Sequence, residues 1–451
     1  MITKKPSHEQ LQNSLLQSFS LLKIGTHLRK GGITKGLGYS CLELFRIIFL
    51  LVFQHKNWFR LLESEKRSDL PGKDAVYRFL NHPRYNWRAF LYSFSASLIR
   101  SIRPLTSENR VCVFIVDDSV FSRSRSKSLE LLARVHDHTT GKFVKGFQML
   151  TLGWSDGFTF LPIDFSLLSS RKEENRLQGI RGDIDKRTNG YKRRKEALQS
   201  KPDAVSAMIQ HALQAGFEAD YVLMDTWFTH HPLIQEICKN GIHVIGMVKQ
   251  LKQRYLYQNQ QLTLSELFQR SSKQRTNGEL LGSILVTIGN GLPAKIVFVK
   301  NRNKKREWLT ILSTDCTLEA GEIVRIYGMR WKIETFFKVV KSSLQLAKEF
   351  QGRCYDLLIS HTTIVFARYI FLAWESRKEA DGKTIGGLFY LLCDEVKDMD
   401  FKSAFLQLWS LVESMVTQIK KTETLVCQVK QFFRTLPSYI KVCLGAPMCE
   451  S

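Results

Sequence analysis

The sequence lacks several features that mark whole classes of protein. Its nine cysteines, scattered over 451 residues, include no Cys-x-x-Cys pair, so the zinc sites and redox disulfides built on that spacing are not expected. Proline and glycine are sparse, at 10 and 27 residues, which excludes fibrous and low-complexity classes. No Gly-x4-Gly-Lys-Ser/Thr loop occurs, so no need for ATP is expected. The unpaired, scattered cysteines predict a reduced, cytoplasmic protein.

Long hydrophobic runs are also lacking. The stretch from Leu42 to Phe53 is strongly apolar but carries Glu43 and Arg46, whereas a helix that crosses a bilayer needs about 20 apolar residues. We therefore predict a buried helix there and no membrane partner. The first ten residues, MITKKPSHEQ, contain no apolar run, so no signal peptide is expected.

Negative charge is scarce relative to positive charge. The chain has 66 Lys and Arg residues against 42 Asp and Glu, a formal net charge of +24. A surplus of this size attracts polyanions, and the resulting binding should weaken steeply as salt rises. Nucleic acid is therefore the leading candidate partner. The surplus is already present in the helical pattern at the start of the chain, which predicts a helical DNA-binding region there.

The pattern of apolar residues changes from helical to strand-like near residue 110. Strands are predicted within 110–168, at 219–224 and repeatedly within 243–315, and helices at 202–215, from Glu319 to near Leu346 as one long helix, and onwards to about 440. This alternation predicts an α/β fold. The basic stretch 171–201 is interpreted either as a solvated loop or as an arm that contacts phosphates.

Acidic residues stand where acids are costly. Asp117 and Asp118 follow the apolar residues 113–116, and Asp225 follows Val222 to Met224. Strand ends bring distant side chains to one edge of a sheet. Carboxylates that converge there repel one another, so they persist as anions mainly where a divalent cation neutralises them.

The oxygen-only character of these side chains favours Mg²⁺ or Mn²⁺ over zinc. Two such ions would stabilise the attacking and leaving oxygens of a phosphodiester displacement. Together with Glu334 on the predicted long helix, the acids are candidate metal ligands. Because neighbouring strand residues point to opposite faces, Asp117 and Asp118 are mutually exclusive in this role, and both stay open at this point.

Four polar residues of the predicted long helix fall on one stripe. Tyr327, Arg330, Glu334 and Lys341 are offset by 0, 3, 7 and 14 positions, which at about 100° per residue places them on one face. We predict that this face looks into the site while the apolar faces pack. The alternative is an ordinary Arg–Glu pair on a solvated helix, worth about 0.2–0.5 kcal/mol.

The spacing Tyr-x2-Arg-x3-Glu-x6-Lys, with the two upstream Asp positions, resembles the signature of bacterial insertion-sequence transposases of insertion sequence family four. The resemblance implies an RNase H-like catalytic core with an Asp-Asp-Glu triad at Asp117, Asp225 and Glu334. It also implies a β-rich insertion between the second Asp and the Glu. Helical regions would flank the core at both ends.

The same resemblance implies roles for further side chains. Arg330 and Lys341 would grip DNA phosphates, and Tyr327 would line the site. The family usually has Ser or Thr two residues after the first Asp, which favours Asp117 over Asp118 as the first ligand. The family also holds an extruded base on an aromatic residue of the insertion. Trp308 is a candidate for that role, against the alternative of a core tryptophan.

These observations predict five regions and one activity. The regions are a helical DNA-binding region (1–108), a first part of the core (109–226), the insertion (227–318), a second part of the core (319–375) and a helical C-terminal region (376–451). We predict a transposase that binds element ends, cuts DNA by metal-dependent hydrolysis and joins the 3′-hydroxyl ends to target DNA. The alternatives are a stand-alone RNase H-like nuclease and a domesticated DNA-binding protein that does not cut.

The implied cofactor is a pair of Mg²⁺ ions, for which Mn²⁺ would substitute. The implied partners are the double-stranded DNA of the element's inverted repeats and of the target, together with further copies of the chain in the DNA complex. The expected location is the bacterial cytoplasm, in association with the nucleoid.

Overall fold

A computed structural model describes residues 19–396, apart from 64–69, 106, 108–109, 252, 272–278, 290, 302–303, 305–306, 379–383 and 395. Most of the predicted C-terminal region, 376–451, therefore lies outside the described residues. Residues 22–52 and 56–388 form one compact unit.

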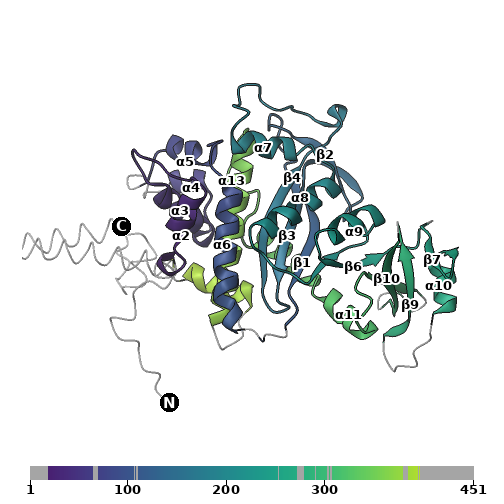
Figure 1. Ribbon diagram of the computed structural model, residues 1–451. Coiled ribbons are helices and arrows are strands. Elements are labelled where there is room, and N and C mark those ends of the chain that lie inside the picture. Colours follow the sequence, from purple (N-terminus) through teal and green to yellow (C-terminus); the bar gives the residue numbers. More distant parts are fainter. Residues whose placement is uncertain are drawn as a thin grey trace, which may run out of the picture. The chain divides into compact units, whose positions relative to one another are not determined.

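The unit begins with helices and then alternates strands and helices. The helices are α2 (Ile24–Lys30), α3 (Cys41–Leu50), α4 (Trp58–Leu62), α5 (Lys73–Leu80), α6 (Trp87–Ile102), α7 (Asn189–Glu196), α8 (Lys201–Gln214), α9 (His231–Cys238), α10 (Leu264–Arg270), α11 (Ala320–Gly328), α12 (Trp331–Ser342) and α13 (Tyr355–Lys378). The strands are β1 (Val113–Ser122), β2 (Ala133–Asp137), β3 (Lys142–Ser155), β4 (Phe160–Leu168), β5 (Tyr221–Met224), β6 (His243–Val248), β7 (Tyr255–Tyr257), β8 (Gln260–Leu262), β9 (Leu280–Ile288), β10 (Leu292–Lys300) and β11 (Trp308–Ser313). Figure 1 shows helices α2–α6 at one end of this unit and strands β7, β9 and β10 at the other.

The central part of the sheet has the strand order β4-β3-β1-β5-β6. Strand β3 is antiparallel to β1 and β4, whereas β5 and β6 run parallel to β1. Every residue of β4 and β5 is buried, as expected for strands covered on both faces. Three antiparallel strands followed by two parallel ones make an RNase H-like core, so the predicted α/β fold class is confirmed.

The strands that follow β6 continue the same sheet. Strand β11 pairs antiparallel with β6, with Ser313 opposite Ile245, and β10, β9 and β7 follow outward in that order. The strands predicted within 243–315 are therefore present, and β6 belongs to the parallel ladder of the core. Because β11 pairs with β6, the β-rich segment formed by strands β7–β11 is connected to the core by backbone hydrogen bonds as well as by covalent connections.

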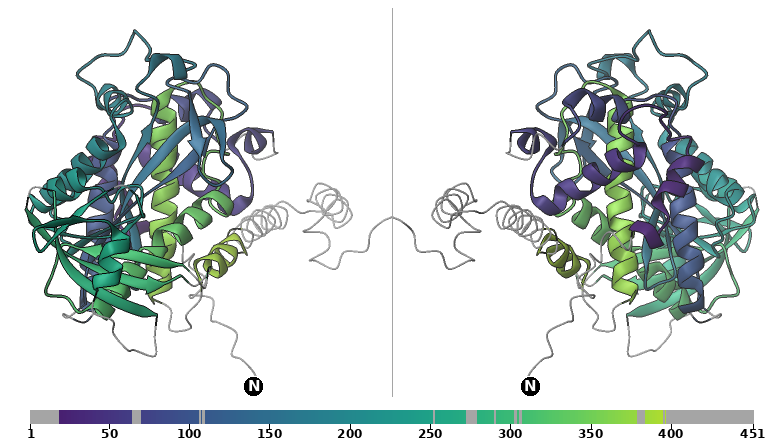
Figure 2. Two further views of the ribbon diagram at one scale, coloured as in Figure 1. Left: turned by 90° about the vertical axis from the view of Figure 1, so that its right-hand side faces the viewer. Right: turned by 90° about the vertical axis from the view of Figure 1, so that its left-hand side faces the viewer.

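Helix α13 packs against both the sheet and the N-terminal helices. It contacts β4 of the sheet and the helices α3, α5 and α6, of which α6 also contacts β4 (Figure 2). Its stretch Tyr355–Arg377 is long and apolar enough to cross a membrane, but 94% of its most apolar window is buried inside the protein. Phe336 of α12 joins it to the sheet through ring contacts with Tyr369 and Phe160. The apolar stretch that begins at Leu42 forms the buried helix α3, as predicted.

The first acidic pair does not end a strand, and that expectation from the sequence is wrong. Parallel pairing between β1 and β5 stops at Val116 opposite Met224. Antiparallel pairing with β3 continues to Ser122 opposite Gly146. Asp117 and Asp118 therefore stand where β1 loses one neighbour and keeps the other.

The predicted single helix from Glu319 to near Leu346 is two helices, so that expectation is also wrong. Helix α11 ends at Gly328 and α12 begins at Trp331. Between them the backbone N–H groups of Met329 and Arg330 donate to the carbonyls three residues earlier, each at 3.0 Å. This tighter 3-10 spacing changes the rotation per residue. The stripe calculated for one continuous helix therefore does not hold across the break.

The basic stretch 171–201 is partly structural. Arg193 and Arg194 on α7 are buried, and the Arg194 guanidinium donates to Glu130 at 2.7 Å and to Asp356 at 2.8 Å. A buried charge is tolerated only when it is paired in this way. These two arginines hold the fold together and are not part of a solvated loop or a phosphate-contacting arm.

Candidate active site

The first two acids lie side by side at one edge of the core sheet. Val116 of β1 and Met224 of β5 are partners in the parallel ladder. Asp117 and Asp225 are the next residue of each chain segment, so they lie at the same end of this ladder. The Asp117 side chain is 14% exposed, and Asp225 is half-buried. One carboxylate oxygen of Asp225 accepts a hydrogen bond at 2.8 Å from the backbone N–H of Trp227. The turn after β5 thereby fixes the orientation of Asp225.

Alternation along β1 separates Asp117 from Asp118. The Asp117 carboxylate accepts a hydrogen bond at 3.0 Å from the Arg330 guanidinium, next to α12. The Asp118 carboxylate instead forms an ion pair at 2.9 Å with Lys201, the first residue of α8. Neighbouring strand residues point to opposite faces. Asp117 therefore shares its face of the sheet with α12, and Asp118 faces α8.

The Arg330 guanidinium bridges two of the acids. It forms ion pairs with Asp117 and with Glu334, whose side chain is 36% exposed. The guanidinium carbon also lies 6.0 Å from the centre of the Tyr327 ring. Tyr327, Arg330 and Glu334 are thus brought together despite the helix break, because the 3-10 turn keeps Arg330 close to both helices.

Lys341 lies further along the same face of β1. Its ammonium group donates a hydrogen bond to the hydroxyl of Ser119, which is two residues beyond Asp117 and therefore on the same face. The structure places six of the seven predicted residues, all except Asp118, around this edge of the sheet.

Burial shapes the ionisation of the site. Desolvation raises the pKa of Asp117 to about 7, and the negative charge of Asp225 adds to this shift while the Arg330 cation opposes it. Burial also raises the pKa of Tyr327 to about 12 and lowers the pKa of Lys341. Desolvation therefore outweighs the Arg330 cation, and the protonated form of Asp117 is more favoured in the folded chain than in water.

The Asp117 pKa leads to a stability prediction. Because the pKa rises from 3.8 to about 7 on folding, the folded chain binds more protons than the unfolded chain between these values, so stability falls as pH rises from about 4 to about 7. Each unit of pKa difference corresponds to about 1.4 kcal/mol. With a chelator present, we expect Asp117→Asn to be more stable than the wild type at pH 8, and this difference to disappear near pH 4.

Thermal unfolding at several pH values measures this effect. Asp118→Asn is the matched control, because it removes an ion pair with Lys201 and should lower stability at pH 8. An Asp117→Asn protein whose stability relative to the wild type is the same at pH 4 and pH 8 would contradict the prediction.

The donor chemistry of the site fits a hard divalent cation. Asp117, Asp225 and Glu334 supply only carboxylate oxygens, which suit Mg²⁺ or Mn²⁺ better than zinc. Among the residues that the structure describes, no three His, Cys, Asp or Glu side chains surround one point closely enough to hold an ion as they stand. The Arg330 guanidinium contacts both Asp117 and Glu334.

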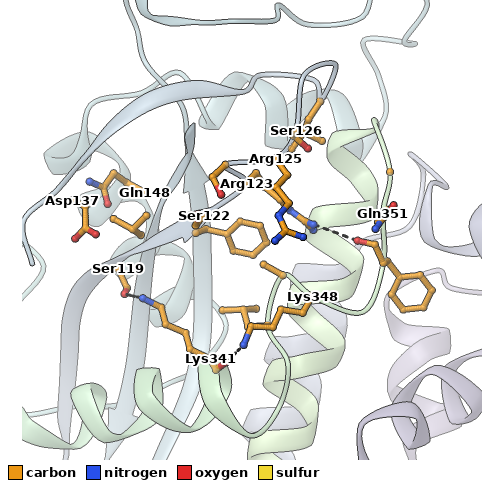
Figure 3. A pocket seen from close by; sticks show the side chains of 18 of the residues that line it. Ser119, Ser122, Arg123, Arg125, Ser126, Asp137, Gln148, Lys341, Lys348 and Gln351 are labelled. Atoms are coloured by element: carbon orange, nitrogen blue, oxygen red, sulfur yellow. Dashed lines mark hydrogen bonds between the residues drawn. The ribbon is translucent and has the colours of Figure 1, made fainter. Parts of the chain in front are cut away.

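A large cavity beside this site was missed by the sequence analysis. It has a volume of about 1410 Å³ and extends from Asp118, Ser119 and Lys341 along the loop after β1 (Figure 3). That loop, residues 122–128, reads Ser-Arg-Ser-Arg-Ser-Lys-Ser. The alternation of small hydroxyls with cations was the available signal.

Trp308 belongs to an aromatic cluster of the β-rich segment. Its ring stacks on Phe268 and meets Phe298 edge-on, with both pairs of ring centres 5.1 Å apart. These contacts favour a packing role. The idea that Trp308 holds an extruded base remains a prediction.

Comparison with known proteins adds two family matches. A model described as DDE superfamily endonuclease matches residues 50–276, a span that contains Asp117 and Asp225. A model described as transposase DDE domain matches residues 199–358, a span that contains Asp225 and Glu334. No curated protein matches the sequence.

One solved structure that aligns with the chain is that of the Drosophila P element transposase strand transfer complex. The alignment has 11% sequence identity and a TM-score of 0.21, and it covers 59% of this chain and 57% of that one. The chain thus spans little more than half the length of that transposase.

Proposed function

Because this chain belongs to the DDE superfamily of endonucleases, we propose that it is a DNA transposase that cuts at the ends of a mobile element and joins the resulting 3′-hydroxyl ends to target DNA. The transposase DDE domain at residues 199–358 supports the choice of transposase over other nucleases. The spacing of Tyr327, Arg330, Glu334 and Lys341 supports a finer assignment to insertion sequence family four.

The observation that carries the proposal is the placement of three carboxylates at one sheet edge. Asp117 and Asp225 follow paired residues of β1 and β5, and α12 brings Glu334 to within reach of the same arginine as Asp117. We assign Asp117, Asp225 and Glu334 as catalytic residues and metal ligands. Asp118 is left out of the set, because it faces α8 and pairs with Lys201.

Divalent cations held by these acids, expected to be two Mg²⁺ ions with Mn²⁺ as a substitute, would activate the attacking oxygen and stabilise the leaving oxygen. In the free chain Arg330 neutralises Asp117 and Glu334 in their place. A phosphate that enters the site offers Arg330 a bidentate partner. We propose that Arg330 exchanges its carboxylate partners for the DNA backbone and that Lys341 adds a second phosphate contact, while the Tyr327 ring orients Arg330.

The proposed partners are double-stranded DNA and further copies of the chain. The net charge of +24 supports DNA binding, to which the helical region 1–108 would contribute. Helix α6 of that region buries Phe90 and Phe94 and forms an ion pair at 2.8 Å between Arg88 and Asp164 of β4. Deletion of the region would therefore remove part of the core. A bacterial cytoplasmic location on the nucleoid is part of the same proposal.

The proposal is tested with the full chain and a supercoiled plasmid that carries the DNA on both sides of its gene. We expect Mg²⁺-dependent nicks at inverted repeats, followed by products in which the freed ends are joined to other DNA. Cuts without joining would support the stand-alone nuclease. Sequence-specific binding without any cut in Mg²⁺ or Mn²⁺ would support the non-cutting DNA-binding protein.

A further inference from the structure

The cavity beside the candidate active site is strongly cationic. Six basic side chains line it, against two acids. The basic residues are Arg123, Arg125, Lys127, Lys341, Lys348 and Arg353. Both acids already have partners, since Asp118 pairs with Lys201 and Asp137 accepts hydrogen bonds from Thr139 and Thr140. The cavity therefore presents positive charge to whatever enters it.

Arg123 is the most unusual of these cations. One nitrogen of its guanidinium donates to the carbonyl of Phe350 at 3.3 Å. Its other two guanidinium nitrogens, Nε and Nη2, are buried and have no hydrogen-bond partner within the described part of the chain. The guanidinium carbon lies 5.4 Å from the centre of the Phe121 ring, and burial lowers the pKa of Arg123 to about 10.

A buried guanidinium with two unused donors is unfavourable in the free protein. Buried donors nearly always have a hydrogen-bond partner, and a buried donor without one lowers the stability of the fold by about 1–3 kcal/mol. The backbone of Arg123 is held in place by a 2.8 Å hydrogen bond from its N–H to the carbonyl of Lys145. This bond fixes the backbone at Arg123, and a hydrogen-bond acceptor that reached the guanidinium would satisfy its unpaired donors.

The lining of the cavity indicates the chemistry of that acceptor. Hydroxyl groups alternate with the cations, since Ser122, Ser124, Ser126 and Ser128 all line the cavity. Figure 3 shows Ser122 and Ser126 near Arg123 and Arg125. Both kinds of group donate hydrogen bonds to phosphate oxygens. Two aromatic residues of the lining, Phe121 and Phe350, are each 1% exposed, and the His138 ring is exposed. The described lining therefore offers many more donors to phosphate oxygens than ring faces on which a base could stack.

The size of the cavity favours a polymer over a small molecule. Its volume of about 1410 Å³ exceeds the range of about 300–1,000 Å³ typical of small-ligand pockets. One end is formed by Ser119 and Lys341, on the face of β1 that also carries Asp117. Asp117, Asp225 and Glu334 do not line the cavity itself, so it lies beside the edge of the sheet where the three acids gather.

We propose that this cavity binds the sugar-phosphate backbone of the DNA strand that runs on from the reacting phosphate, and that Arg123 makes a direct phosphate contact in it. The proposal rests on the proposed function for the identity of the substrate. The contact is with the backbone alone, so it contributes affinity and position without reading sequence.

Salt dependence of DNA binding tests the contact. Each phosphate contact contributes about 0.7–0.9 to the slope of log affinity against log salt concentration, so its loss reduces the slope by about that amount. We expect Arg123→Met to show this reduction together with a loss of affinity on the order of 10-fold. Arg123→Lys, which keeps the positive charge, should retain much of the wild-type salt slope and much of the wild-type affinity. Arg134→Gln is the control, because Arg134 is exposed on β2 and does not line the cavity.

Stability of the free chain separates a binding role from a structural one. If Arg123 serves the fold, Arg123→Met should lower the melting temperature. If Arg123 instead serves to bind a phosphate, Arg123→Met should keep or raise the melting temperature of the free chain. The increase in melting temperature on adding DNA should then be smaller for Arg123→Met than for the wild type.

Placing single uncharged methylphosphonates in a DNA end locates the contact. One position near the reacting phosphate should weaken binding of the wild type but have no further effect on Arg123→Met. The wild type could cut DNA while Arg123→Met matches it in DNA affinity, in salt dependence and in the methylphosphonate positions that weaken binding. In that case the cavity proposal is wrong and the proposed function stands. The wild type could instead bind DNA without cutting it. If Arg123→Met then still reduces the slope of log affinity against log salt concentration, the cavity proposal stands and the proposed transposase function is wrong. A wild type that binds no DNA overturns both.

Discussion

Asp225→Asn is expected to lower the rate of DNA cleavage in Mg²⁺ by about 10³-fold or more. Asp225 stands beside Asp117 at the end of the parallel ladder, and an amide has neither the charge nor the second carboxylate oxygen that a hard cation requires. Its carboxylate also accepts two backbone hydrogen bonds from the turn that follows, which the amide oxygen retains. Affinity for DNA should change little. Plasmid nicking and gel shift measure the two effects separately.

The control for this variant is Asp220→Asn. Asp220 lies just before β5, at the opposite end of the strand, where it accepts a hydrogen bond from the backbone N–H of Cys112 at 2.8 Å. The same chemical change there should leave the cleavage rate near that of the wild type. Cleavage by Asp225→Asn at the wild-type rate would remove Asp225 from the proposed set.

Glu334→Gln should abolish both nicking and the joining of pre-nicked ends, because one site is proposed to serve both reactions. We expect each rate to fall by about 10³-fold or more, with DNA binding retained. The measurement compares an intact substrate with one that already has a free 3′-hydroxyl end. Joining of pre-nicked ends at the wild-type rate would mean that a different set of ligands performs that step.

Arg330→Ala and Lys341→Ala should show the reverse pattern, with weaker binding of the DNA end and slower reactions at every step that needs it positioned. Lys338→Ala provides the control, since Lys338 is exposed on the same helix α12. In the free chain, Arg330→Ala also leaves Asp117 and Glu334 without their shared cation.

The positions of the acids were predictable, whereas their surroundings were not. An apolar run followed by Asp identified β1 and β5 in outline, but residues 117–119 are polar and resemble a loop. They remain in β1 because β3 continues to pair with them, and this partner lies in a later part of the chain. Pairing with a strand that is distant in the sequence cannot be predicted from the local pattern of apolar and polar residues.

The same limit applies to the helix break and to the buried charges. Gly328, a poor helix former, precedes the 3-10 turn at Met329, but a single glycine within a helical pattern does not decide whether the helix continues. Arg194 is fully buried because Glu130 and Asp356, 64 and 162 residues away, neutralise it. The Ser-Arg-Ser-Arg-Ser-Lys-Ser loop becomes a cavity wall only once residues 341–353 lie opposite it.

The separation of the acids along the chain has a consequence for protein synthesis. The hydrogen bond between Arg330 and Asp117 joins residues 213 positions apart. At about 5–20 residues per second, a ribosome needs roughly 10–40 s to cover that distance. Asp225 is added about halfway through this interval, and from then on the nascent chain carries two of the three proposed acids but no α12. Any product of premature termination before α12 would lack the third proposed carboxylate and also α13, against which α3, α5 and α6 pack. The proposed capacity to cut is therefore acquired only when most of the chain has been made.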